Sequence, residues 1–164
     1  MAQEKLSLED FLEAVDPNNK PFIQELHKYF LDNGCKGTFE EKKSGPLASY
    51  KHTKLKRSIA NVIFRKHGML VRIYGENANK FQDFMNTLPQ EMVQAIDNSG
   101  ECKRLTQNLC SPKCTGYDFT IGDTHFQKCR YNCFEFLVNE ESKPYITTFI
   151  ENELRERTTV AVAH

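Results

Sequence analysis

Residues Ser58-Ile-Ala-Asn-Val-Ile-Phe-Arg-Lys-His-Gly-Met-Leu-Val-Arg-Ile-Tyr74 contain two apolar runs, 58–66 and 69–74, with a His-Gly step between them. Their β-branched residues and short length predict two strands, and His67-Gly68 is short enough to join them as a tight hairpin. The apolar side chains fall on both sides of the pair: Ile59, Ile63 and Val71 on one side, Val62 and Phe64 on the other. We therefore expect the first strand to be covered on both faces.

The flanking segments predict further strands and several amphipathic helices. Upstream, the apolar period is two over 37–42 and 47–52, and earlier still Ser7 and Pro21 begin two helices. Downstream, helical segments are predicted between 79 and 97, and a second hairpin precedes a final helix that begins at Ser142. The pattern thus predicts two successive units, 58–97 and 117–156, each a hairpin followed by a helix. Their hairpins would join into one sheet. The sequence predicts an α+β fold, a mostly antiparallel sheet with helices packed on one face.

The order of elements between 20 and 97 is a helix, a strand meander and an amphipathic helix. Together with the stretch from Ser58 to Tyr74, this order resembles the small uncharacterised bacterial α+β domains of the YjbR/YdhG-like group. The resemblance does not extend over the Cys-rich third of the chain. It carries no catalytic motif, so it implies an α+β fold and no particular activity.

The chain has 164 residues, enough for one domain with a full core. We expect a single α+β domain over 1–157, with an N-terminal part at 1–100, a Cys-rich part at 101–157 and a tail at 158–164. The 22 Lys plus Arg balance the 22 Asp plus Glu, which disfavours a dedicated nucleic-acid binder. The N-terminus does not resemble a signal peptide, and no stretch approaches the roughly 20 apolar residues of a membrane span. We therefore expect a cytoplasmic protein with reduced thiols and no membrane partner.

Five of the six cysteines lie between 102 and 133. Zinc is bound by four ligands in a tetrahedron, so two ligating sulfur atoms lie only about 4 Å apart. The segment 111–113 is typical of a turn that would bring two cysteines together, whereas 129 and 133 could share an ion only if 130–132 leave the strand. We predict a structural zinc site with four ligands and two alternates: Cys110, Cys114, Cys129 and Cys133, with Cys102 and His125 as the alternates.

Other interpretations of these cysteines stay open. Reduced cysteines also pack as small hydrophobic side chains, since free cysteine is among the most buried residue types. Disulfides, an iron–sulfur cluster or a redox-active thiol pair would use the same residues differently. A nucleophilic pair of Cys129 with His125 is a further alternative.

Basic residues around the hairpin are the clearest electrostatic feature of the sequence. Six of them could contact phosphates or an anionic ligand: Lys54, Lys56, Arg57, Arg65, Lys66 and Arg72. Tyr50 and Phe64 lie among them and could stack on bases, as in single-strand binders. The balanced net charge instead favours a solvated sheet edge, which lysines protect against pairing with another chain.

No catalytic residue is specified, because the chain contains no G-x-S-x-G, P-loop, H-E-x-x-H or G-x-G-x-x-G motif. Three hypotheses about function remain. The first is a binding module, braced by zinc, that holds a small molecule or a protein partner. The second is a thiol-dependent redox or metal-dependent enzyme that uses the cysteine cluster. The third is a weak nucleic-acid binder.

Overall fold

The structure, a computed structural model, describes residues 5–55, 57–112, 116–129 and 133–163. Six strands form an antiparallel sheet in the order β1-β2-β3-β4-β5-β8. Their bounds are β1 Lys5–Leu6, β2 Cys35–Lys42, β3 Gly45–His52, β4 Ser58–Arg65, β5 Gly68–Ile73 and β8 Phe134–Leu137. The predicted hairpin is β4–β5. Its two turn residues are 66 and 67, one position earlier than expected, because Arg65 pairs with Gly68.

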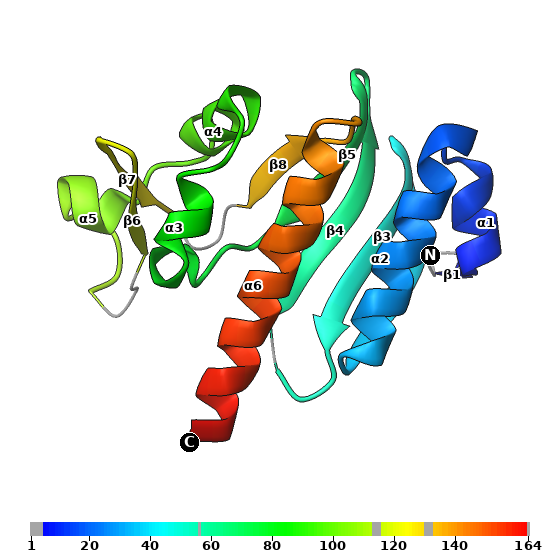
Figure 1. Cartoon of the computed structure of the whole chain (residues 1–164), viewed down its shortest axis with the longest axis horizontal. Helices are drawn as coiled ribbons and strands as arrows, with labels where there is room; N and C mark the ends of the chain where they lie inside the picture. Colours follow the sequence, from blue (N-terminus) through cyan, green and yellow to red (C-terminus); the bar gives the residue numbers. More distant parts are fainter. Residues whose placement is uncertain (1–4, 56, 113–115, 130–132, 164) are drawn as a thin grey trace.

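Two long helices, α2 and α6, lie across the same face of this sheet (Figure 1). The helices are α1 Leu8–Glu13, α2 Lys20–Asp32, α3 Gln82–Met85, α4 Gln90–Asp97, α5 Lys103–Gln107 and α6 Ser142–Ala163, with short 3₁₀ turns at Pro17–Asn19 and Ala78–Lys80. The predicted capping box forms at α1, where the Asp10 N–H donates to the Ser7 hydroxyl and the Ser7 N–H donates to the Asp10 carboxylate. The predicted α+β class, with helices on one face, is confirmed.

Residues that pair across the strands form one apolar layer beneath α2 and α6. One row of this layer, buried throughout, is Phe39, Ala48, Val62, Val71 and Phe136. The ring centroid of Phe149 on α6 lies 5.8 Å from that of Phe136, and Phe30 on α2 stacks on Tyr50 at 4.3 Å. Because each buried aromatic side chain removes about 150–250 Å² from water, this layer is the main hydrophobic contribution to stability.

A buried ion pair between Glu153 and Arg157 also connects α6 to the sheet. The Glu153 carboxylate is fully buried and accepts hydrogen bonds from the backbone N–H of Asn77 at 2.8 Å, from its side-chain amide at 2.6 Å and from Nε of Arg157 at 3.0 Å. Arg157 also donates to the carbonyl oxygens of Ser58 and Tyr74, at 3.0 and 2.6 Å. Burial raises the pKa of Glu153, and the Arg157 charge with the Asn77 hydrogen bonds opposes that rise.

The second predicted hairpin forms but does not join the sheet. It consists of β6 Tyr117–Ile121 and β7 Thr124–Lys128, which make a separate two-stranded sheet. This small sheet is held beside α3, because the Thr120 N–H donates to the Gln82 side chain and the Gly122 N–H to the Asn86 side chain. The strand that extends the main sheet is β8, and it pairs with β5. The expected joining of two equivalent hairpins is therefore wrong.

Two further differences concern the end of the chain and the second side of β4. Residues 158–163, expected to form a tail, continue α6. Both sides of β4 are buried, as expected, but among the described residues no helix lies across the second side. We call that second side of the sheet the open face. Its outer positions are exposed: Lys36, Thr38, Lys51, Glu135 and Leu137. In the described part of the chain no helix is both long and apolar enough to cross a membrane.

Candidate functional site on the open face

A continuous row of polar side chains runs across four strands of the open face. Ser49 of β3 pairs with Asn61 of β4, Asn61 with Arg72 of β5, and Arg72 with Glu135 of β8. Directly paired residues point to the same side of a sheet, so these four side chains lie next to one another. The row interrupts strands that are otherwise apolar, which makes it the most polar feature of the sheet centre.

Asn61 is the centre of a hydrogen-bond network and is only 6% exposed. In the orientation of its amide that satisfies all its neighbours, its nitrogen donates to the Ser49 hydroxyl and to the Ala60 carbonyl, both at 3.1 Å. Its oxygen then accepts a hydrogen bond from an Nη of Arg72 at 3.3 Å. The Tyr74 hydroxyl lies 3.4 Å from the same amide. This network fixes the position of the Arg72 guanidinium on the sheet.

Arg72 is incompletely satisfied by its neighbours. Among the described residues, its Nε is buried and has no hydrogen-bond partner. Glu135 is its neighbour in register, yet no ion pair of the described chain joins the two. Because a buried N–H group without a partner costs about 1–3 kcal/mol, an acceptor that reached this Nε would be bound favourably.

More cations border Arg72 on the side of the β2–β3 hairpin. A cavity of about 340 Å³ lies there, lined by the side chains of Lys42, Lys43, Arg65 and Arg72 and by the apolar Leu47 and Ile63. Arg65 donates a hydrogen bond to the Ser44 hydroxyl at 3.1 Å, and Lys42 pairs with Glu40 at 2.9 Å. The cavity therefore places a positive field around the Arg72 guanidinium.

A row of apolar side chains lies beside the polar row. Ile63 of β4 pairs with Leu70 of β5, and Leu70 pairs with Leu137 of β8. Ile63 is buried, whereas Leu137 is 41% exposed. The two rows are two residues apart along each strand, about 6.6 Å. The open face thus offers a cationic group and an apolar strip within the reach of one small molecule.

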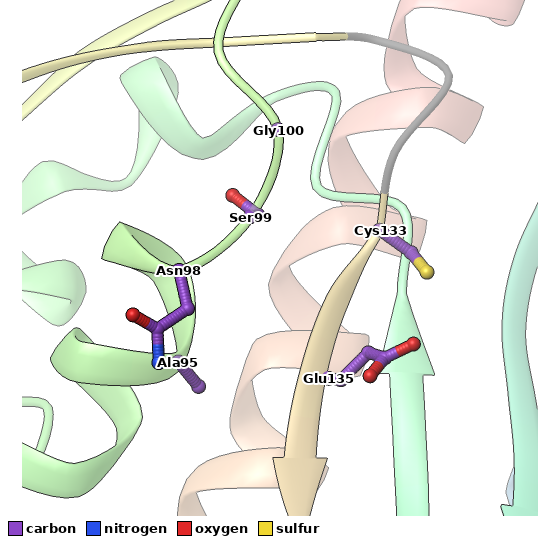
Figure 2. Close-up of a pocket in the computed structure, with 6 residues that line it drawn as sticks. All are labelled: Ala95, Asn98, Ser99, Gly100, Cys133 and Glu135. Atoms are coloured by element: carbon purple, nitrogen blue, oxygen red, sulfur yellow. The ribbon is translucent and has the colours of Figure 1, made fainter.

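Helix α4 forms a wall along the β8 side of the open face. A cavity of about 370 Å³ separates β8 from the end of α4, and Figure 2 shows Glu135 on β8, and Cys133 directly before this strand, across from Ala95 and Asn98. A neighbouring cavity of about 340 Å³ has the apolar Leu70, Met92, Phe136 and Leu137 in its lining, together with Glu91, Glu135 and Glu141. This side of the open face is therefore acidic, opposite in sign to the hairpin side.

Lys128 holds the C-terminal end of α4 in place, and this lysine is only 1% exposed. Its ammonium group donates to the carbonyl oxygens of Asp97 at 2.8 Å and Ser99 at 3.2 Å, at the C-terminal end of α4. It also pairs with the Glu101 carboxylate at 2.6 Å. A cation at this end of a helix satisfies carbonyl groups that lack intrahelical partners and opposes the helix dipole.

The Cys133 thiol lies in this site between charges of both signs. Burial raises its pKa, the nearby charges of Arg72 and Arg65 lower it, and Glu135 raises it further. The net direction is upward, so this cysteine is held as a neutral thiol rather than as an activated thiolate. Cys133 is therefore a weak nucleophile in this environment.

Among the described residues, the predicted zinc ligands lie in different surroundings. Cys110 is exposed after α5, Cys133 lies on the open face, and His125 pairs instead with Asp118 at 2.6 Å. Cys114 lies outside the described residues. Within the described ranges, no three His, Cys, Asp or Glu side chains are grouped closely enough to hold one metal ion.

Two of the cysteines do come near each other, Cys102 and Cys129. The Cys102 N–H donates to the Gln127 carbonyl and the Cys129 N–H to the Gly100 carbonyl, so these two segments pair as antiparallel strands. The cysteines then lie diagonally on one side of the pair, with Cα atoms roughly 7–8 Å apart. The sixth cysteine, Cys35, is buried in the core, where burial raises its pKa to about 11.

The predicted basic group is divided between the two ends of β4. Arg57 directly precedes the strand and pairs with Glu76, whereas Arg65 ends the strand, about 26 Å away along an extended chain. Lys54 is exposed near Arg57, Lys66 is exposed in the hairpin turn beside Arg65, and Lys56 lies outside the described residues. Of the six predicted residues, the structure brings together Arg65 and Arg72 around one cavity.

Sequence reasoning did not identify Ser49, Asn61, Tyr74 or Glu135 as site residues. A signal was present, because Asn61 and Arg72 interrupt apolar strands at positions that face the same side. That signal becomes informative only when the pairing of β4 with β5 is known, since the register decides which polar residues are neighbours.

Comparisons of the chain with protein-family models and with curated proteins, and of its structure with solved structures, gave no match.

Proposed function

We propose that the protein is a binding module whose open face holds a small organic anion with an apolar body. The proposal depends on one observation, the buried Nε of Arg72 that has no acceptor in the described structure. A carboxylate is the group that a guanidinium binds best, because its two oxygens match two parallel N–H donors. The adjacent Ile63, Leu70 and Leu137 would cover the apolar part of the ligand.

The surroundings of Arg72 favour an anion rather than a neutral acceptor. Arg65, Lys42 and Lys43 share its cavity, so the field at the guanidinium is positive. The absence of a recognisable catalytic motif and the raised pKa of the Cys133 thiol give no support to a reaction at this site. Binding without chemistry is therefore the function that these residues support best.

The test is a titration with 4-methylpentanoate, followed by the ¹H–¹⁵N signals of the backbone and of the arginine Nε–H groups. Its roughly eight non-hydrogen atoms suit a dissociation constant on the order of 1 mM. We expect the Arg72 Nε–H signal to shift, together with the amides of Leu70 and Leu137. The matching alcohol, 4-methyl-1-pentanol, lacks the charge and is expected to produce no shift at Arg72.

Two variants separate a specific site from general attraction to a basic surface. Arg72→Gln is expected to weaken 4-methylpentanoate binding about tenfold or more, because a hydrogen bond to a charged group contributes about 1.5–3 kcal/mol. Lys36→Gln makes the same change of charge at an exposed position of the open face, three strands away, and is expected to leave binding unchanged. Equal binding by both variants, or no shift of the Arg72 signal, would overturn the proposal.

We also propose that zinc braces the Cys-rich segment, with Cys102 and Cys129 among its ligands. What supports this is the pairing of their two segments, which directs both side chains to the same side. Thiolates at this separation are too far apart for an unstrained disulfide but could converge on one ion. We expect one zinc per chain in elemental analysis and a lower melting temperature after chelation, since metal-binding energy here is folding energy. Zinc-free protein with an unchanged melting curve would contradict the brace.

A further inference from the structure

Arg72 and Glu135 carry opposite charges side by side on the open face, and among the described residues no ion pair joins them. They are direct neighbours in register on β5 and β8, and neighbouring strands lie about 4.8 Å apart. The guanidinium is turned toward β4, where it donates to Asn61, and it lines the basic cavity at the β2–β3 hairpin. Glu135 lines both cavities beside α4, and its carboxylate points from β8 toward the neighbouring strand β5, away from Ala95 and Asn98, as the Cys133 thiol does (Figure 2).

We infer that the ligand of the open face is a zwitterion, an α-amino acid with an apolar side chain. This inference rests on the proposed function, because it assigns the bound anion to the α-carboxylate at Arg72. The ammonium group of the same molecule pairs with Glu135, and the side chain lies on Leu70 and Leu137.

The chemistry of an α-amino acid matches the arrangement of the two rows. Its carboxylate and ammonium groups are attached to the same carbon atom, so they bind charges that are held on adjacent strands. Its side chain leaves from that carbon too and reaches the apolar row, which lies about 6.6 Å along the strands. A ligand with only a carboxylate would leave Glu135 facing the bound anion, a repulsion that the ammonium group removes.

The charges around the ammonium position support the same assignment. Glu91 and Glu141 line the cavity that Glu135 also lines, and His67 is the one basic side chain among its described lining residues. The apolar Met92 and Phe136 complete this lining. A cation with an apolar neighbour is thus complementary to the α4 side, just as an anion is complementary to the hairpin side.

The experiment compares three matched probes by the same titration: L-leucine, 4-methylpentanoate, which lacks the amine, and 3-methylbutylamine, which lacks the carboxylate. Wild-type protein is expected to bind L-leucine about fivefold or more tightly than either singly charged probe, the scale of one partly exposed ion pair. Glu135→Gln is expected to abolish this preference and to leave the affinity for 4-methylpentanoate unchanged or slightly higher. Glu41→Gln removes an exposed carboxylate on a different strand, β2, and is expected to retain the preference for L-leucine.

The outcomes distinguish this inference from the proposed function. If wild-type protein binds 4-methylpentanoate as tightly as L-leucine, the zwitterion is overturned while the anion site stands. The same holds if Glu135→Gln keeps the wild-type preference for L-leucine. If neither carboxylate shifts the Arg72 signal, both the anion site and the zwitterion are overturned. Because Glu135 is exposed, its variant is expected to keep the fold, and its dispersed amide spectrum would verify this.

Discussion

Replacement of Lys128 by methionine tests whether a buried cation holds the wall of the candidate site. Methionine keeps the apolar stem but removes the donors to the Asp97 and Ser99 carbonyls. Each carbonyl left without a partner costs about 1–3 kcal/mol, and the lost interaction with the helix dipole adds about 0.3–2 kcal/mol. Methionine avoids the cost of burying a charge, which offsets part of this sum. We expect Lys128→Met to lower the free energy of unfolding by about 3 kcal/mol.

The assay is urea denaturation followed by tyrosine fluorescence, since the chain has six tyrosines and no tryptophan. With an m-value of about 2 kcal/mol/M, the midpoint would fall by roughly 1.5 M. Glu101→Gln serves as the control, because Glu101 is 57% exposed and its ion pair with Lys128 contributes at most about 1 kcal/mol. The reasoning is refuted if Lys128→Met shifts the midpoint no more than the control does.

Two other predictions concern the ion pair on α6 and the histidine beside the core. Arg157→Gln leaves the buried Glu153 without its cation and should cost about 3–5 kcal/mol in urea denaturation, whereas Arg155→Gln, exposed on the same helix, should change little. Burial lowers the pKa of His27 below its usual 6.5, and its ring lies 3.0 Å from the Tyr50 hydroxyl. The unfolded chain therefore takes up the proton first, so stability falls as pH drops below about 6.5. His27→Gln should lose part of the difference between urea midpoints at pH 7.5 and 5.5; an unchanged difference would contradict this.

The fold class could be predicted from the sequence because residues close together in the chain determine where each helix and strand begins. The capping box at Ser7, the apolar run of β4 and the Ser142 start of α6 are all short-range signals, and each appears in the structure. The separate β6–β7 sheet was not accessible in the same way. Its strands alternate as well as those of the main sheet do, so periodicity could not show with which sheet they pair.

The burial of Lys128 could not be predicted from the sequence either. A lysine beside a cysteine near the end of a strand reads as a solvated cation, since lysine is almost never fully buried without partners. Its partners are the carbonyls at the end of α4, about 30 residues earlier in the chain. Lys128 therefore has these partners only because the end of α4 packs beside β7.

Spacing along the chain was enough to predict the starts of α1, α2 and α6 and the β4–β5 hairpin, whereas it did not predict α5 or the continuation of α6 beyond residue 157. Which side chains share a surface depends instead on how the strands pair. Strand pairing placed Arg72 beside Glu135 and Asn61, and it brought Arg65 and Arg72 around one cavity. The physical reason is strand register: partners on adjacent strands are neighbours in space whatever their distance in sequence, and the register is fixed by the buried layer that packs against α2 and α6.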